Sequence, residues 1–424
     1  MIEHSLLVVS LILVSGCTVG NDTGRKTWEG RYPGECSDAA DNDGDGKYDC
    51  NDPDCAGAPD CAEPDTDTDT DTDTDTDTDT DTDTDTDTDV QAYPELMTPP
   101  SWAWQMDYFT VEPDRGWVWE IDESWELWNA SVPQPFVKPD GTFGMLVSEL
   151  GGKSLEQPKT LYESRDGYDW TWDGSILGHP DDFTGVYCGN KLNDAAVWVE
   201  DQNSYRIIYE GMYEPRLDPH ADPKDPQEYF FCHGTTTDGE SMEPEDDYLY
   251  EGGFQGENNS VPSVLSASDN SGVVFYNGDM MDESQAGSGI RAFAIAQHTL
   301  EITQLAPDPI LPWNCVDPDP IFVEGGGLRL YHTMFLRQNQ EYRGFEPGIG
   351  AVDVMDTFEV GDDYRQMLLS PGNCDLGGPE TGECYLDPAY LRLPDGTMFM
   401  FVTALTRPEH GFAYVSIKRA IAVD

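Results

Sequence analysis

Positive charge is scarce in this chain of 424 residues, which has 22 Lys and Arg against 83 Asp and Glu and a net charge of −61. Nucleic-acid binding is excluded, because its affinity comes from Lys and Arg that neutralise phosphates. No apolar run approaches the roughly 20 residues that a membrane-spanning helix needs. The HExxH, GxSxG, P-loop and dinucleotide-binding motifs are absent, and none of the ten cysteines forms a CxxC pair. Zinc proteases, GxSxG hydrolases and nucleotide-binding enzymes are therefore unsupported.

The N-terminus has the pattern of an export signal. Residues 6–14 are mostly apolar and have the length of a signal-peptide h-region, although no Lys or Arg precedes them. The Ser-Gly-Cys sequence that ends at Cys17 resembles the lipobox of bacterial lipoproteins. We therefore expect a signal peptide at 1–16, a lipid on Cys17 and an anchored segment at 17–34, which places the protein on the cell envelope, at the outer membrane surface. An ordinary cleaved signal with an incidental cysteine is the alternative.

The nine cysteines after Cys17 favour an oxidising compartment, where they would form disulfides. Cys374 and Cys384 flank a polar loop and are the favoured pair. Other plausible pairs are Cys36 with Cys50 and Cys55 with Cys61. Because nine is an odd number, one thiol is left over.

Residues 35–64 form a short module rich in Cys and Asp, and its acidic residues have the spacing of an EF-hand calcium loop. Gly46 occupies the sixth position, and Asp52 replaces the usual bidentate Glu at the twelfth. The expected calcium ligands are Asp41, Asp43, Asp45, Lys47 through its carbonyl, Asp49 and Asp52. The segment is similar to DNDGDG repeats of myxobacterial surface proteins and to thrombospondin type 3 repeats. A merely acidic loop is the alternative.

Residues 65–90 are expected to form a disordered linker. Positions 65–89 are a strict alternation of 13 Asp and 12 Thr, which offers no apolar face to bury and repels itself. When stretched, such a segment reaches about 80 Å at ~3.3 Å per residue. A spacer is the simplest function, with a weak calcium store or a glycosylated stalk as alternatives.

Residues 94–424 are expected to be all-β, because short runs of aromatic and β-branched residues alternate with polar ones between turn residues. Four units repeat, each with a strand opened by a proline, a tight turn and a second hydrophobic strand. The prolines used to align them are Pro135, Pro262, Pro320 and Pro388. The first interval is twice the others, and residues 195–209 fit a fifth unit without the proline. Five repeated units predict a five-bladed β-propeller.

This pattern resembles the five-bladed glycoside hydrolases of families 43 and 32. Residues 164–170, with the sequence SRDGYDW, are similar to the S-x-DG-x-x-W segment of these propellers. The resemblance covers about residues 125–420. It implies three carboxylates around the channel, where the inner strands begin: one as general acid, one as base or nucleophile, and one that tunes a pKa.

The family places its first-blade Asp directly before a proline, and Gln134 stands at the position aligned with it here. Other units offer acids near the starts of their strands. The candidate catalytic residues are Asp317, Asp319, Glu257 and Asp387, and Asp194 lies near the second unit. The competing interpretation is that Asp-Pro is simply favourable turn chemistry at a strand entrance.

The sequence thus predicts a surface-tethered monomeric lipoprotein whose propeller binds extracellular glycan and hydrolyses it if the carboxylates are functional. A propeller that only binds glycan or protein, and a structural protein of the cell envelope, are the alternatives. Six of the eleven tryptophans lie between positions 102 and 128. Some could stack on sugar rings, but packing between blades is the expected use of most of them.

Overall fold

The computed structural model describes most of the chain from residue 91 to its end. The described ranges are 91–149, 159–177, 194–213, 228–238, 241–245, 249, 260–278, 289–306, 308–312, 315–337, 345–361, 364–369, 382–407 and 414–424. Cys17, the calcium-type loop, the Asp-Thr linker and Glu257 lie outside these residues, so the predictions made for them remain predictions. Within the described ranges, no helix has the length and apolar character needed to cross a membrane.

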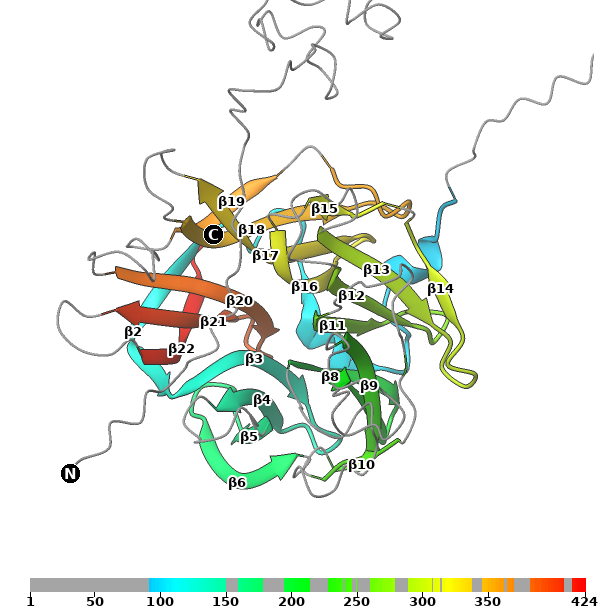
Figure 1. Cartoon of the computed structure of the whole chain (residues 1–424), viewed down its shortest axis with the longest axis horizontal. Helices are drawn as coiled ribbons and strands as arrows, with labels where there is room; N and C mark the ends of the chain where they lie inside the picture. The colour runs from blue at the N-terminus through cyan, green and yellow to red at the C-terminus, as the bar shows by residue number, and fades with distance from the viewer. Residues whose placement is uncertain are drawn as a thin grey trace, which may run out of the picture. The chain divides into compact units, whose positions relative to one another are not determined.

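The chain forms five antiparallel sheets arranged around a common centre, which confirms the five-bladed β-propeller (Figure 1). The first blade contains β3 (Ala130–Val137), β4 (Phe143–Glu149), β5 (Lys159–Ser164) and β6 (Thr171–Leu177). The second contains β7 (Ala195–Asp201), β8 (Ser204–Tyr213), β9 (Glu228–Thr236) and β10 (Glu243–Pro244). The third contains β11 (Ser260–Ser266), β12 (Gly272–Gly278), β13 (Gly289–Ile295), β14 (Ile302–Gln304) and β15 (Leu311–Pro312).

The last two blades also recruit strands from the start of the propeller. The fourth contains β16 (Cys315–Val323), β17 (Leu328–Arg337), β18 (Phe345–Val354) and β19 (Arg365–Leu369), with β1 (Thr110–Val111) added in parallel to β16. The fifth contains β20 (Gly382–Arg392), β21 (Met398–Arg407), β22 (Tyr414–Ala422) and, as its outer strand, β2 (Trp119–Trp128). Two 3₁₀ helices, η5 (Pro94–Met97) and η6 (Trp104–Phe109), precede β1.

Pairing of β2 with β22 closes the ring, because it joins the start of the propeller to its end. Trp119 on β2 packs edge-on against Tyr331 and Tyr390, with ring centroids 5.9 and 6.2 Å away. The carboxylate of Asp424, the last residue, accepts a backbone hydrogen bond of 2.5 Å from Trp117. The two ends of the propeller are therefore held by backbone pairing, aromatic packing and a charged terminal contact.

The innermost strand of four blades carries the same β-bulge at an X-Pro step. The residue before the proline has a positive φ in each case: Val132, Val261, Asp317 and Asp387. At each bulge two residues drop out of the pairing register. Proline is tolerated there because the skipped position needs no amide donor for the ladder. The equivalent prolines are thus 133, 262, 318 and 388, and the alignment on Pro135 and Pro320 was wrong by two residues.

The tryptophans between 102 and 128 divide between core and surface. Trp117 and Trp119 are buried and Trp102 and Trp125 partly buried, as blade packing requires, whereas Trp104 and Trp128 are exposed. Cys384 is buried, but Cys374 lies outside the described residues, so their pairing stays a prediction.

Candidate functional site

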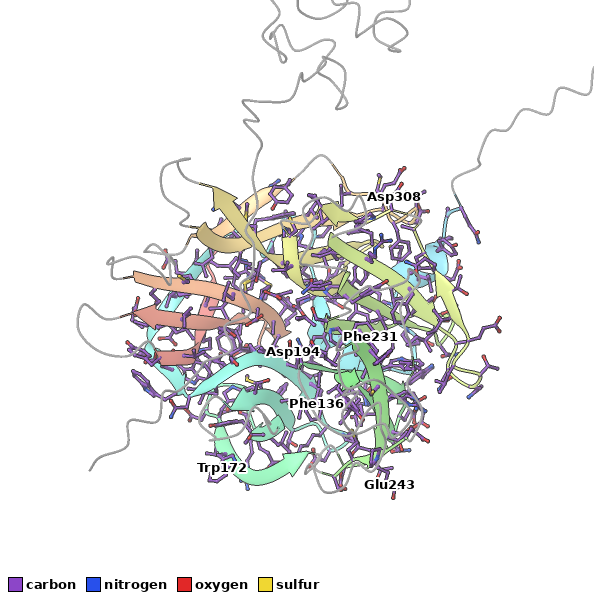
Figure 2. All side chains as sticks on the ribbon, in the orientation of Figure 1. Phe136, Trp172, Asp194, Phe231, Glu243 and Asp308 are labelled. Carbon is purple, nitrogen blue, oxygen red and sulfur yellow. The ribbon has the colours of Figure 1, made fainter. Side chains whose placement is uncertain are left out.

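The bulges of four blades and the strand register of the second identify five equivalent residues around the centre of the propeller. In the second blade the equivalent residue is found by register. The Ala196–Ile208 pair lies three pairs from Val199–Tyr205, as the Asp319–Tyr331 pair of the fourth blade lies three pairs from Phe322–Leu328. Two residues earlier stand Asp194 and Asp317. The ring of five therefore consists of Val132, Asp194, Val261, Asp317 and Asp387. Figure 2 shows Asp194 near the centre, whereas Trp172 and Glu243 lie at the rim.

Three of these five positions are aspartates, and their carboxyl groups interact. Asp317 and Asp387 share a side-chain hydrogen bond, and the charge of Asp194 acts on both. Burial raises the pKa of Asp387 well above its usual range, and the negative charges of Asp317 and Asp194 raise it further. Burial also raises the pKa of Asp317. Two carboxylates in contact cannot both ionise easily, so the pair keeps its last proton to a higher pH than an isolated aspartate does.

Polar side chains from neighbouring blades lock these residues in place. The Asp387 amide donates a hydrogen bond of 2.9 Å to the Thr333 hydroxyl, and the Asp317 amide donates one of 3.0 Å to the Asn277 side chain. Thr333 also bonds the Asp317 carboxyl, and Thr403 bonds the Asp387 carboxyl. The Thr333 hydroxyl thus links the backbone of Asp387 in the fifth blade to the carboxyl of Asp317 in the fourth. Positive φ values of 54° at Asp317 and 48° at Asp387 are strained for a residue with a Cβ, and this network holds them.

Asp319 lies two residues further along β16 than Asp317. Its carboxylate accepts a hydrogen bond of 2.8 Å from the Tyr390 amide and another from Ser263. It faces a cavity of about 30 Å³ that Gln134 and Met106 of η6 also line. Burial raises the pKa of Asp319 to about 8. Its hydrogen bonds therefore join it to the structural interior, not to the carboxyl pair.

The strand pairing shows that Gln134 does not stand at the position expected for the first-blade aspartate. Gln134 is equivalent to Asp319, since each follows its bulge by one ladder position. Val132, not Gln134, stands where the fourth and fifth blades have Asp317 and Asp387. Asp194 completes the set in the second blade. The sequence already offered Asp194 as an acid near the second unit, but no proline follows it, so only the hairpin register shows that it is equivalent to Asp317 and Asp387.

Within the described ranges, no group of three or more His, Cys, Asp and Glu has the geometry to hold a metal ion.

No family model matches the chain, and no curated protein matches it. Among solved structures, sucrose-6-phosphate hydrolase from Lactobacillus gasseri aligns with a TM-score of 0.50 and 11% identity, over 70% of this chain and 60% of that one. A thermostable family-43 glycoside hydrolase aligns with a TM-score of 0.47 and 14% identity, over 73% and 92%. Xylan β-1,4-xylosidase from Bacillus halodurans C-125 gives 0.43 and 14%, over 71% and 54%.

The chain spans less than two thirds of the length of the Lactobacillus gasseri hydrolase. At such low identity the alignment with the Lactobacillus gasseri hydrolase supports the propeller fold and nothing of the chemistry. That fold is the one found in glycoside hydrolases.

Proposed function

We propose that the propeller hydrolyses glycosidic bonds in an extracellular glycan, with Asp387 as general acid, Asp194 as base or nucleophile and Asp317 as the residue that tunes Asp387. The observation that carries the proposal is the buried hydrogen bond between Asp317 and Asp387, with the charge of Asp194 acting on both. Glycoside hydrolysis needs one carboxyl that is protonated and a second that is ionised.

The proposed reaction uses these groups in turn. The proton held on Asp387 passes to the glycosidic oxygen, so the leaving sugar departs as a neutral alcohol. Asp194 either removes a proton from the water that attacks the anomeric carbon, or attacks that carbon itself to form a glycosyl-enzyme. In the second case water hydrolyses the glycosyl-enzyme and gives its proton to Asp387, which restores both carboxyl groups. Asp317 keeps the pKa of Asp387 high through its adjacent charge, which retains the proton at neutral pH.

The family resemblance supports three carboxylates at the starts of inner strands, but it does not match this chain blade by blade. The resemblance implies an Asp in the first blade, and Val132 stands there. In this chain the acids come from the second, fourth and fifth blades. A propeller that binds glycan without hydrolysing it is the alternative, and the apolar first-blade position favours it.

The first test is a hydrolysis panel of aryl glycosides, arabinan and xylan. The wild-type chain is expected to hydrolyse at least one of them, and Asp194→Asn is expected to lower the rate by about 10²–10⁴-fold, because an amide can act neither as base nor as nucleophile. Asp140→Asn, in an exposed hairpin turn of the first blade, is the matched control and should keep the wild-type rate. No turnover on any substrate, or full activity in Asp194→Asn, would reject the proposal.

We also propose that the residues before the propeller tether it to the envelope. The support comes from the sequence: an h-region at 6–14, the lipobox-like end at Cys17, the calcium-type spacing from Asp41 and the Asp-Thr spacer at 65–89. Mass spectrometry of the membrane fraction should find a diacylated cysteine at position 17. An unmodified thiol there would contradict the anchor.

Calorimetry provides a separate measurement for the calcium-type module. A peptide covering residues 20–65 should release or absorb heat when titrated with calcium, because its carboxylates are spaced as in an EF-hand loop. Absence of binding heat would leave the module as an acidic loop and would not affect the proposed anchor.

A further inference from the structure

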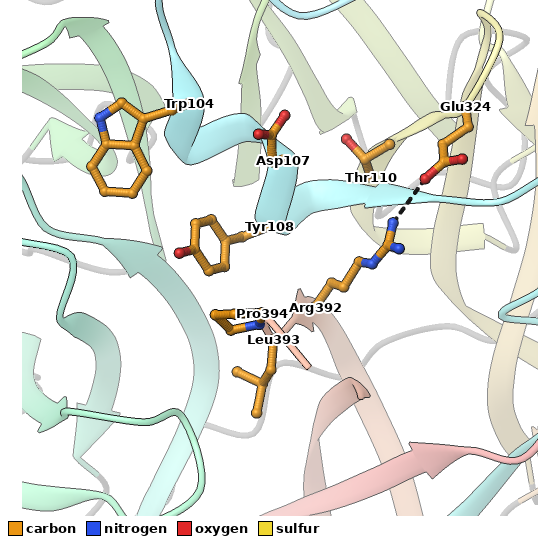
Figure 3. Close-up of a pocket in the computed structure, with 8 residues that line it drawn as sticks. All are labelled: Trp104, Asp107, Tyr108, Thr110, Glu324, Arg392, Leu393 and Pro394. Carbon is orange, nitrogen blue, oxygen red and sulfur yellow. Dashed lines mark hydrogen bonds and ion pairs between the residues drawn. The ribbon is translucent and has the colours of Figure 1, made fainter. Parts of the chain in front are cut away.

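We propose that a second pocket, on the face of the propeller opposite the three aspartates, binds a neutral sugar residue of a polysaccharide. Trp104, Asp107, Tyr108, Thr110, Glu324 and Arg392 line it together with Leu393 and Pro394 (Figure 3). The choice of ligand class rests on the proposed glycan function, whereas binding at this pocket does not require hydrolysis.

The pocket is remote from the ring aspartates. Asp317 lies near the start of β16, and Glu324 follows the end of the same strand. Seven residues at ~3.3 Å each separate the two by about 20 Å. In the fifth blade Asp387 lies in the middle of β20, and Pro394 is likewise seven residues further along the chain, just past the end of the strand. The helix η6 lines the pocket through Trp104, Asp107 and Tyr108 and the internal cavity beside Asp319 through Met106.

One wall of the pocket is aromatic. The side chains of Gln105 and Met106 are buried, whereas Trp104 remains 38% exposed and Tyr108 is partly exposed. The rings of Trp104 and Tyr108 meet edge-to-face at 6.1 Å, and Figure 3 shows them along the same side of the pocket. Amphipathic aromatic rings of this kind cover the apolar face of a sugar while their polar groups stay in water.

The opposite wall carries a fixed guanidinium group. Arg392 donates hydrogen bonds to Glu324 at 2.9 Å and to Glu112 at 2.8 Å, so its side chain is held in one orientation. Asp107 is exposed at the rim. Hydroxyl groups of a sugar can donate to the Asp107 carboxylate and accept from the remaining Arg392 N–H groups. A volume of about 420 Å³ lies within the usual range for small-molecule sites.

The charge of the pocket lining favours neutral sugars over acidic ones. Arg392 is already paired with two carboxylates, and Asp107 adds a third negative group without a second cation in the lining. A uronic acid or a sugar phosphate would meet a net negative site and be repelled. Neutral pentoses and hexoses fit the pocket better.

Affinity electrophoresis in native gels tests this site. The full chain carrying Asp387→Asn, which prevents digestion of the gel, is run in gels with arabinan, arabinoxylan or polygalacturonate. A neutral polysaccharide is expected to retard it. Trp104→Ala should weaken that retardation at least about tenfold in apparent Kd, because a stacked tryptophan is a typical binding hot spot. Trp172→Ala, 60% exposed on the outer strand of the first blade, is the matched control and should leave retardation unchanged.

The outcomes separate this site from the catalytic proposal. With Asp387 restored, Trp104→Ala should keep wild-type hydrolysis of a small aryl glycoside, because that substrate reaches only the aspartates. Asp107→Ala, at an exposed position, serves as the second variant if Trp104→Ala does not fold. Retardation that persists in both variants, no retardation by either neutral polysaccharide, or equal retardation by polygalacturonate would each overturn the site. Retardation lost in Trp104→Ala without any hydrolysis by the wild type would uphold the site and reject only the catalysis.

Discussion

Replacing Asp387 by Asn is expected to lower kcat/KM for glycoside hydrolysis by about 10²–10⁴-fold, the usual contribution of a general acid. The amide keeps the size of the side chain and its contact with Thr403, but it has no acidic proton to pass to the leaving oxygen. The loss should be smallest with aryl glycosides whose phenolate leaves without protonation, and largest with polysaccharides. Steady-state kinetics on both substrate types measures the difference.

Replacing the neighbouring Asp317 by Asn is expected to change the pH dependence of hydrolysis. The negative charge of Asp317 raises the pKa of Asp387, so Asp317→Asn should lower that pKa. Because the acid must be protonated, the rate falls as pH rises through its pKa, and the basic limb of the pH profile should move to lower pH. An unchanged or higher basic limb would contradict the assigned roles. Asp140→Asn, away from the site, should leave the profile as in the wild type.

Replacing Asp319 by Asn is expected to stabilise the propeller at neutral pH. Burial raises the pKa of this carboxyl to about 8, against 3.8 for an ordinary aspartate. The folded state binds this proton more tightly than the unfolded chain does. The Asp319 carboxyl therefore makes its full contribution to the free energy of unfolding below pH 3.8, and that contribution is lost as pH rises toward 8. At pH 7 the lost stability is on the order of 4 kcal/mol at 1.36 per pKa unit, and an amide avoids it.

Denaturant unfolding of both proteins at pH 4, 7 and 8.5 checks this prediction. The advantage of Asp319→Asn should grow with pH and nearly vanish at pH 4, because the wild-type carboxyl is then protonated when folded. The Asn oxygen can still accept the hydrogen bond that the Tyr390 amide donates. A difference in the free energy of unfolding that does not change with pH would show that Asp319 does not titrate as its burial implies.

Asp140→Asn is the control with the opposite sign. Hydrogen bonds from Thr142 lower the pKa of Asp140, so its contribution is present above its unfolded pKa and is lost as pH falls. This variant should lose a little stability at neutral pH and none at low pH. The effect stays small because the side chain is exposed.

Much of the propeller could be predicted from sequence because each blade repeats a local pattern. The X-Pro step, the Gly-containing turn and the alternating strands all depend on neighbouring residues, and the spacing even located the fifth unit at residues 195–209. Which residues of the different blades are equivalent could not be predicted in this way. The first and fourth units each contain two prolines, in VPQP and DPDP, and only the bulge in the strand pairing shows that Pro133 and Pro318 are the equivalent ones.

The sequence by itself determined the number of blades, their hairpins and the presence of aspartates near the inner strands, because turn chemistry and strand periodicity are local. Tertiary structure alone decided which aspartates meet. Asp194, Asp317 and Asp387 are separated by 123 and 70 positions in the chain, yet the ring brings their charges together, and burial in that ring raises the pKa of the Asp317–Asp387 pair. Proximity and desolvation depend on how the blades close, which residue spacing along a chain does not encode.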